Sequence, residues 1–328
     1  MRVLIAYDAS PGSDCALADL ARAWLPEPVE ARIATIAEDP WPAPGAASSA
    51  SSFGTGRGDD RSRLAVEHAR AIASRGVERT QRAFPTWRTE SVVVAGDAAD
   101  ALLDVAADWK PDLVVVGSHG RSASVDSPVL GSVGRRVVAE APCSVRVGQA
   151  HRAAPGGVRL VVGYDLSESA DAAVAAVAAR RWPSGSSAHV LVAVDPVVAH
   201  ADRDPASGGV PWKELRSRAA DCASKLRAAG LEATSDVVTG DARRTLVEHA
   251  AAFGADAIVI GARGLGGSHR PLVGSVAAAV VENAPCSVEV VGDQEQRGMR
   301  DRGAVIPLLR HVVDERPLPL WRRAPEPE

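Results

Sequence analysis

The sequence lacks the features that mark a nucleic-acid-binding or membrane-embedded protein. It contains no dense run of Lys and Arg, and its formal charge is −4 at pH 7. It therefore offers no cationic surface for nucleic acids or anionic membranes. No apolar run approaches the roughly 18 residues of a spanning helix, and Asp8 interrupts the N-terminal run before a signal-peptide core could form. We expect a soluble, cytoplasmic protein with no nucleic-acid or membrane partner.

Cysteine is also scarce. Cys15, Cys143, Cys222 and Cys286 are spread widely, without a Cys-x-x-Cys pair or a cluster with His. This spacing argues against a disulfide scaffold and a structural zinc site. Cys143 and Cys286 each stand in the pentapeptide Ala-Pro-Cys-Ser-Val, and we interpret both as small apolar residues at the start of equivalent strands.

Longer fragments also recur, in the same order, in the two parts of the chain. RVLIAYDAS (residues 2–10) returns as RLVVGYDLS (159–167), and PDLVVVGSHG (111–120) returns as ADAIVIGARG (255–264). A repeat of more than 100 residues indicates a duplicated domain, because solenoid units have only about 20–50 residues. We expect a first repeat at residues 1–150 and a second repeat at residues 158–292, each with its own core, joined by a linker at residues 151–157.

Within each repeat, short runs rich in Val, Ile and Leu alternate with helical segments, a pattern typical of a parallel sheet covered on both faces. Expected strands lie at 3–7, 31–37, 89–95, 112–117 and 144–147, and at 159–164, 189–194, 233–239, 256–261 and 287–291. Expected helices include 169–182, 212–229, 241–252 and 275–283. With right-handed crossovers, the fold class is α/β, with two tandem doubly wound domains.

Two segments fall outside this alternation. Residues 40–58 are rich in Pro, Ala, Ser and Gly, so we expect a mobile loop after the second strand of the first repeat. Residues 293–328 form a tail that is polar at first and Pro-rich at its end. For this tail we expect weak order, with one short helix packed on the body.

The segment GARGLGGSHRPLVGS, Gly261 to Ser275, follows the fourth expected strand of the second repeat. In a doubly wound sheet, ligands bind at the carboxyl ends of the strands. Glycines let the backbone approach a ligand closely, and the helix that begins near Ser275 presents free N–H groups. The expected ligand group is phosphate, with the Ser275 hydroxyl and Arg263 as further donors. The segment matches neither a Walker motif nor a dinucleotide-binding turn.

The first strand of each repeat ends in Tyr-Asp-x-Ser, which places Asp8 and Asp165 at equivalent positions, each at the carboxyl edge of its own repeat. A carboxylate there can accept hydrogen bonds from ribose hydroxyls or help to hold a metal ion on phosphates. It can equally cap the helix that follows. The residues alone leave both interpretations open.

Together, these motifs resemble the universal stress protein family, in its ATP-binding branch and in a tandem form. The family signature Gly-x2-Gly-x9-Gly-Ser/Thr occurs in the second repeat at Gly261, Gly264, Gly274 and Ser275. The Asp-x-Ser and Ala-Pro-Cys-Ser-Val motifs extend the resemblance over residues 1–148 and 158–292. It implies five-stranded parallel sheets in strand order 3-2-1-4-5, with ATP across the carboxyl edge and Mg²⁺ accompanying it near Asp165.

The resemblance also implies which residues hold the nucleotide. In the second repeat, Asp165 would serve the nucleoside, the backbone around Ala193 the adenine edge, and a phosphate loop would comprise Gly261, Arg263, Gly264, Gly274, Ser275 and Val276. A weaker site in the first repeat would comprise Asp8, Thr35, Gly117, His119, Gly120, Gly131, Ser132 and Val133. There, ten residues separate Gly120 from Gly131 where the signature has nine, and they include Asp126. We therefore expect the second repeat to bind first.

Single-domain members of the family dimerise through their last strands. The resemblance therefore implies that the two repeats pair as an internal pseudo-dimer, through residues 143–147 and 286–291. A homodimer of the whole chain stays open.

Two functions remain open: a nucleotide-responsive binding module of the stress response with at most slow ATP hydrolysis, and an ATPase or phosphotransferase with a dedicated substrate. His119 could act as a base or a phosphoryl acceptor. Arg263 stands at the same position in the second repeat, which favours donation to phosphate. Neither repeat offers a nucleophile, base and orienting group at recognisable spacing. We predict no catalytic residue and no metal site built from protein groups alone, and we favour the binding module.

Overall fold

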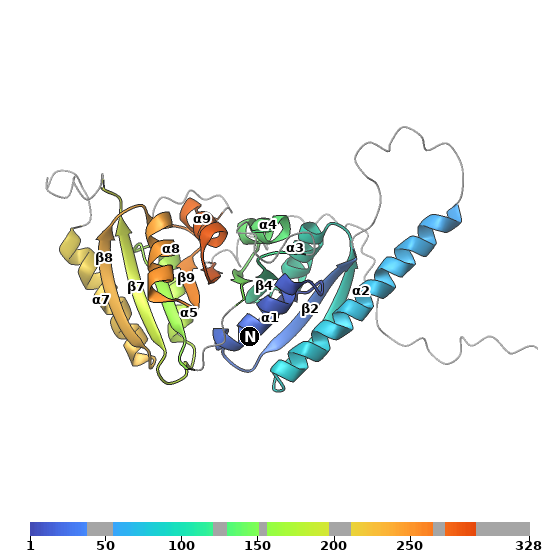
Figure 1. Cartoon of the computed structure of the whole chain (residues 1–328), viewed down its shortest axis with the longest axis horizontal. Coiled ribbons are helices and arrows are strands. Elements are labelled where there is room, and N and C mark those ends of the chain that lie inside the picture. Colours follow the sequence, from blue (N-terminus) through green and yellow to red (C-terminus); the bar gives the residue numbers. More distant parts are fainter. Residues whose placement is uncertain (38–54, 121–129, 151–155, 197–210, 265–272, 293–328) are drawn as a thin grey trace, which may run out of the picture.

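The computed structural model describes residues 1–37, 55–120, 130–150, 156–196, 211–264 and 273–292, in which strands and helices alternate (Figure 1). The first repeat contains β1 (Arg2–Ala6), α1 (Pro11–Ala23), β2 (Glu30–Ala37), α2 (Thr55–Ala83), β3 (Arg88–Ala95), α3 (Ala98–Trp109), β4 (Leu113–Gly117), α4 (Ser132–Glu140) and β5 (Ser144–Gly148). The second contains β6 (Arg159–Gly163), α5 (Glu168–Ala178), β7 (Ser187–Val194), α7 (Trp212–Ala228), β8 (Glu232–Thr239), α8 (Ala242–Phe253), β9 (Ala257–Gly261), α9 (Ser275–Asn283) and β10 (Ser287–Val291).

All ten strands that the sequence predicts are present, with ends within about two residues of the predicted ones, but the start of one helix and the end of another differ by more. Helix α2 begins at Thr55, so residues 55–58 are its first turn and not the end of a loop. Once nucleated, a helix gains one hydrogen bond for each residue that it adds, which lets it extend into poor helix formers. Helix α5 ends at Ala178, four residues before the predicted end. The remainder of the predicted loop, residues 40–54, and the tail 293–328 lie outside the described residues.

The ten strands form one continuous sheet in the order β3-β2-β1-β4-β5-β10-β9-β6-β7-β8. Within each repeat all neighbouring strands are parallel, and each repeat has the order 3-2-1-4-5, which confirms the predicted fold class. Strands β5 and β10 join the repeats and are antiparallel, in agreement with the expected internal pseudo-dimer. The strands of the two repeats therefore run in opposite directions, and their carboxyl ends lie on opposite sides of the sheet.

Helices cover both faces of the sheet. Helices α3, α4, α8 and α9 lie on one face and bury a single hydrophobic core that continues across the junction, where α4 and α9 lie side by side (Figure 1). On the other face, α1 and α2 cover a core in the first repeat, and α5 and α7 cover a separate core in the second. None of the helices in the described ranges combines the length and apolar character that crossing a bilayer requires.

The burial of strands β4 and β9 explains why their sequences are continuously apolar. Strand β4 is LVVVG and strand β9 is AIVIG, and in each the first four residues are buried. A strand covered by helices on both faces needs apolar side chains at every position and not at alternate ones. The continuous apolar runs therefore place β4 and β9 near the middle of the sheet, each next to the first strand of its repeat.

Burial in these strands should dominate stability. Leu4 in β1 is fully buried, whereas Leu64 in α2 is 63% exposed. We expect Leu4→Ala to lower the free energy of unfolding by about 2–5 kcal/mol, because it removes buried contacts and leaves a cavity. The matched change Leu64→Ala should cost about 0.5 kcal/mol or less. Urea unfolding followed by circular dichroism measures both, and equal losses would contradict this account of the core.

Candidate functional site

The two aspartates at the carboxyl edge are not the caps of the helices that follow them. Ser10 and Ser167 are the N-caps of α1 and α5, and each hydroxyl accepts the N–H three residues further on, at 3.1 and 3.2 Å. The Oδ1 atoms of Asp8 and Asp165 instead accept the N–H of these serines, at 3.0 and 3.1 Å. The helix-capping interpretation of the aspartates is therefore wrong for both repeats.

The turn that carries each aspartate is strained in the same way. Ala9 and Leu166, between the aspartate and the serine, have φ values of 58° and 68°. Residues other than glycine seldom adopt this left-handed backbone conformation, which costs them about 1–2 kcal/mol. The turn leaves Oδ2 of Asp165 facing the glycine loop: a Cβ atom on Gly264 would lie 2.7 Å from it. In the first repeat the corresponding distance, from Gly120 to Asp8, is 3.8 Å.

The glycine loops hold the two signature glycines in equivalent places. The N–H of Gly274 donates to the carbonyl of Ala262 at 2.7 Å, and the N–H of Gly131 donates to the carbonyl of Ser118 at 2.9 Å. The additional residue between Gly120 and Gly131 thus does not displace Gly131. Residues 121–129, which include Asp126, lie outside the described residues.

Both loops lead into a helix whose N-terminus is suited to an anion. Gly131 and Gly274 are the N-caps of α4 and α9, with extended backbone and no side-chain hydrogen bond to the first amides. The first N–H groups of a helix have no partner within the helix, and the helix dipole makes this end positive. The backbone here can therefore donate several hydrogen bonds to phosphate oxygens.

A tight contact fixes each loop against the first turn of the first helix of its repeat, α1 or α5. In the first repeat, a Cβ atom on Gly12 would lie 1.9 Å from the carbonyl oxygen of His119, so only glycine fits there. In the second repeat Ser169 takes this place, and its hydroxyl donates to the carbonyl oxygen of Arg263. The N–H of Arg263 donates back to the same hydroxyl, at 3.3 Å. Sequence reasoning missed both residues, because neither belongs to the signature.

A cavity of about 290 Å³ lies in the first repeat at this edge of the sheet. Its lining includes seven of the eight residues predicted there, which contribute polar side chains and glycine backbone: Asp8, Gly117, His119, Gly120, Gly131, Ser132 and Val133. Its apolar wall comes from the ends of β1, β2 and β4 and from α3, and includes Ala6, Ala34, Ile36, Leu102 and Val116. The cavity thus has one wall suited to a polar group and one suited to an apolar, flat group.

Thr35 is the one predicted residue of the first repeat that does not line the cavity. Its side chain is buried, and its hydroxyl donates to the carbonyl of Tyr7 at 2.8 Å. The register of β1 with β2 and of β6 with β7 makes Ile36, not Thr35, the equivalent of Ala193. Successive residues of a strand face opposite sides of the sheet, so this error of one residue exchanges a lining side chain for one on the other face.

His119 brings a polar atom to the cavity. Its Nδ1 atom lies 3.0 Å from the hydroxyl of Ser118, and its Nε2 atom is buried with no hydrogen-bond partner among the described residues. A buried polar atom without a partner is costly. A ligand in the cavity could supply the missing hydrogen bond.

In the second repeat the predicted residues lie around the carboxyl ends of its own strands. Asp165, Arg263 and Gly264 come together through the contacts above, Ala193 stands one residue before the end of β7, and Ser275 and Val276 open α9. Residues 265–272 of the loop lie outside the described residues. Within the part of the chain that the structure describes, no three His, Cys, Asp or Glu side chains are grouped so that they could hold a metal ion.

The chain is a doubly wound α/β protein with a glycine loop, an uncapped helix N-terminus and a carboxylate at the carboxyl ends of its strands, the place where ligands bind in folds of this class. Residues 1–147 and 158–292 each match the Universal stress protein family. The chain belongs to this family and carries its domain twice.

One relative and two solved structures are similar to this chain. A protein described as "Universal stress protein in QAH/OAS sulfhydrylase 3'region" from Thermus aquaticus is 45% identical over 58 residues, which cover 18% of this chain and 42% of that protein. A universal stress protein from Archaeoglobus fulgidus DSM 4304 has a similar structure, with a TM-score of 0.62 and 19% identity over 89% of this chain and 98% of that one. A functionally unknown protein from Pseudomonas aeruginosa PAO1 has a TM-score of 0.55 and 12% identity, over 90% and 94% of the two chains. The two solved structures share the fold.

The tyrosine that follows the first strand of each repeat is buried and hydrogen-bonded to an aspartate. Tyr7, which lines the cavity, donates to Asp14 at 2.7 Å, and Tyr164 donates to Asp171 at 3.0 Å. Burial, and then the hydrogen bond to Asp14, raises the pKa of Tyr7 to about 12. Burial likewise raises the pKa of Tyr164 above its ordinary value.

These two tyrosines are the only ones in the chain, so their titration can be followed directly. Between pH 10 and about 12 the unfolded chain releases phenolic protons that the folded chain retains, so the free energy of unfolding should fall as the pH rises. Ultraviolet absorbance of tyrosinate should show little ionisation in the folded protein near pH 10 and full ionisation in denaturant. Tyr7→Phe should remove half of the signal. Ionisation of both tyrosines near pH 10 without unfolding would contradict the expectation.

Proposed function

We propose that this protein binds an adenine nucleotide at the carboxyl edge of each repeat and acts as a nucleotide-responsive binding module of the stress response. The observation that supports this most directly is the cavity of about 290 Å³, which brings together seven residues expected at a nucleotide site. Its size is at the lower end of small-molecule sites, roughly 300–1,000 Å³.

Each part of the site suits one part of the ligand. The apolar wall around Ile36 and Leu102 suits the flat adenine ring. The carboxylate of Asp8, or of Asp165 in the second repeat, can accept hydrogen bonds from ribose hydroxyls. The amides at the start of α4 and α9 can hold phosphate oxygens.

The donor set fits Mg²⁺ only as a companion of the nucleotide. Mg²⁺ commonly binds through one or two carboxylates together with substrate phosphates and water. Each edge offers one aspartate beside the glycine loop, Asp8 or Asp165, which suffices for a shared ion. Bound there, the ion would neutralise phosphate charge.

The second repeat remains our proposal for the tighter site, but for a changed reason. Gly131 and Gly274 make equivalent hydrogen bonds, so the preference does not rest on a displaced helix. The difference lies in the charge beside the phosphates, because Arg263 replaces His119 and arginine is permanently positive. A phosphate chain gains a stronger electrostatic partner in the second repeat.

The preference between repeats can be tested with matched substitutions. Valine at Gly274 would occupy the space between the loop and the start of α9, so Gly274→Val should weaken ATP binding by about a hundredfold through the loss of two or three charged hydrogen bonds. Gly131→Val, the same change in the first repeat, should weaken the tighter binding by less than about threefold. Calorimetric titration with ATP and Mg²⁺ measures both.

Two results would count against these proposals in different ways. Equal losses in the two variants, or a larger loss from Gly131→Val, would remove the preference for the second repeat and leave nucleotide binding intact. If the unaltered protein released no nucleotide on denaturation and took up none in calorimetry, the proposed function itself would be wrong.

Binding without rapid turnover is the second part of the proposal. Ordinary enzymes turn over about 1–1,000 times per second. We expect steady-state phosphate release from ATP to stay below about one per minute, on the order of a hundredfold under the slow end of that range. Ser275→Ala serves as the control for release at this site. Faster release that depends on Ser275 would favour the ATPase or phosphotransferase alternative.

A further inference from the structure

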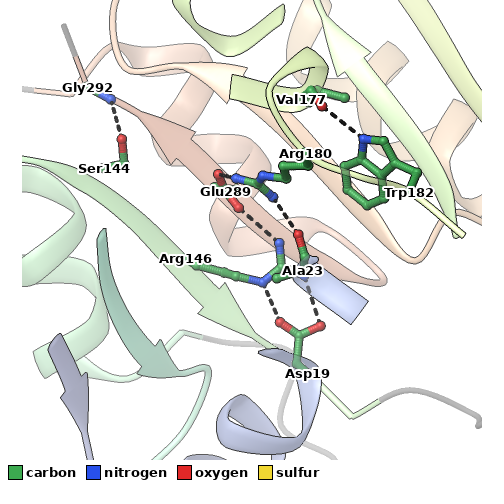
Figure 2. A network of polar contacts seen from close by, with 9 residues as sticks. All are labelled: Asp19, Ala23, Ser144, Arg146, Val177, Arg180, Trp182, Glu289 and Gly292. Atoms are coloured by element: carbon green, nitrogen blue, oxygen red, sulfur yellow. Dashed lines mark hydrogen bonds and ion pairs between the residues drawn. The ribbon is translucent and has the colours of Figure 1, made fainter. Parts of the chain in front are cut away.

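Four charged side chains are buried together where the two repeats join (Figure 2). Arg146 on β5 donates to both carboxylate oxygens of Asp19 on α1, at 2.6 and 3.0 Å, and to Glu289 on β10 at 3.1 Å. Arg180, just after α5, donates to the other oxygen of Glu289 and, at 3.1 Å, to the carbonyl of Ala23. Each of the four charged side chains is at most 3% exposed. Charges alternate along the cluster, so every ion has an opposite neighbour.

The cluster lies on a pseudo-twofold axis that relates the repeats. Residues 145–147 of β5 pair in reverse order with 288–290 of β10, which places Arg146 directly opposite Glu289. These two residues also hold the same position in the repeated sequences Ser-Val-Arg-Val and Ser-Val-Glu-Val. Equivalent positions on the axis thus carry opposite charges. Burial alone would raise the pKa of Glu289, but Arg180 and Arg146 hold it below its ordinary value, so the carboxylate is ionised.

The other ion pairs across the junction have the same polarity. Arg135 on α4 contacts Glu282 on α9 at 3.1 Å, and Arg22 on α1 contacts Asp256 before β9 at 2.7 Å. In each pair the cation belongs to the first repeat and the anion to the second. In the other repeat, the positions equivalent to Arg135, Glu282 and Arg22 hold alanines, at residues 278, 139 and 179 respectively. The charge pattern is therefore asymmetric over an otherwise symmetric backbone.

Two uncharged hydrogen bonds at the junction are symmetric by contrast. The N–H of Gln149 donates to the hydroxyl of Ser287 at 2.9 Å. The N–H of Gly292 donates to the hydroxyl of Ser144 at 3.3 Å (Figure 2). These bonds are related by the same axis, and any pairing of the two strands would retain them. A third bond, from Nε2 of Gln149 to the carbonyl of Ala284 at 3.2 Å, has no counterpart, because Gly292 stands at the equivalent position. This bond is uncharged and sets no like charges against each other, so the strong discrimination between the repeats comes from the charged residues.

We propose that these charges make β5 and β10 specific for each other, so that the edge of each repeat accepts only the other kind of repeat. Two first repeats joined through β5 would bring Arg146 against Arg146, and two second repeats joined through β10 would bring Glu289 against Glu289. Like charges buried in a medium of low dielectric constant repel strongly, and buried ions without a partner are strongly destabilising. The partner that fits each edge is therefore the other repeat of the same chain, which the linker holds close by.

Charge reversal in the full-length chain tests this specificity by complementation. Arg146→Glu sets two glutamates opposite each other at the junction, and Glu289→Arg sets two arginines opposite each other, so neither chain should close on itself. The first variant retains an intact acidic edge on β10, and the second retains an intact basic edge on β5. An equimolar mixture should form a 1:1 dimer of twice the 34.0 kDa chain mass in sedimentation velocity. It should also regain a thermal transition within a few degrees of that of the unaltered protein.

The readout remains decisive if a variant is partly unfolded alone, because complementation would restore a cooperative unfolding transition in the mixture. Two outcomes would overturn the proposal: a mixture whose mass and unfolding curve are the average of the separate variants, or a single variant that stays closed with the unaltered transition temperature. Arg244→Glu and Glu248→Arg reverse an exposed ion pair away from the junction. As matched controls, they should keep the mass and the thermal transition of the unaltered protein, both alone and when mixed.

Discussion

The pairing of β5 with β10 is the interaction on which the rest of the structure depends. One face of this strand pair carries the valines at 145, 147, 288 and 290, which belong to the core shared by α4 and α9. The other face carries Arg146 and Glu289, held by Asp19 and Arg180. Alternation of side chains along a strand lets the same short segments build an apolar junction on one face and an ionic one on the other. Two sheets thereby become one.

This junction also determines where the candidate sites lie. Because β5 and β10 are antiparallel, the strands of the two repeats run in opposite directions, and their carboxyl ends lie on opposite sides of the sheet. The cavity of the first repeat draws all its lining residues from that repeat. Each repeat therefore carries its own candidate site, with its own strained turn, glycine loop and helix N-terminus. The sites differ through Gly12 and His119 on one side and Ser169 and Arg263 on the other.

Much of the fold could be predicted because the signals are local. Apolar runs such as LVVVG and AIVIG predict buried parallel strands, and the repeated fragments predict two copies of one domain. The glycine signature indicated the loop at the carboxyl edge, which the cavity of the first repeat supports. The sequence was less informative where the answer depended on a neighbour. It left open whether the aspartates cap α1 and α5, and in the structure the serines do so. One prediction was wrong, because a shift of one residue on β2 exchanged Ile36 for Thr35.

The sequence by itself determined the duplicated α/β architecture, the strand order that its family resemblance implied, and the glycine positions around each edge. Only the tertiary structure decided what Arg146 and Glu289 do. In sequence each is a single charge within a short apolar strand, and such a residue is ordinarily expected to face solvent. Their partners Asp19 and Arg180 lie more than 100 residues away along the chain. A buried charge is tolerated only where opposite charges meet it, and folding alone brings these four side chains together.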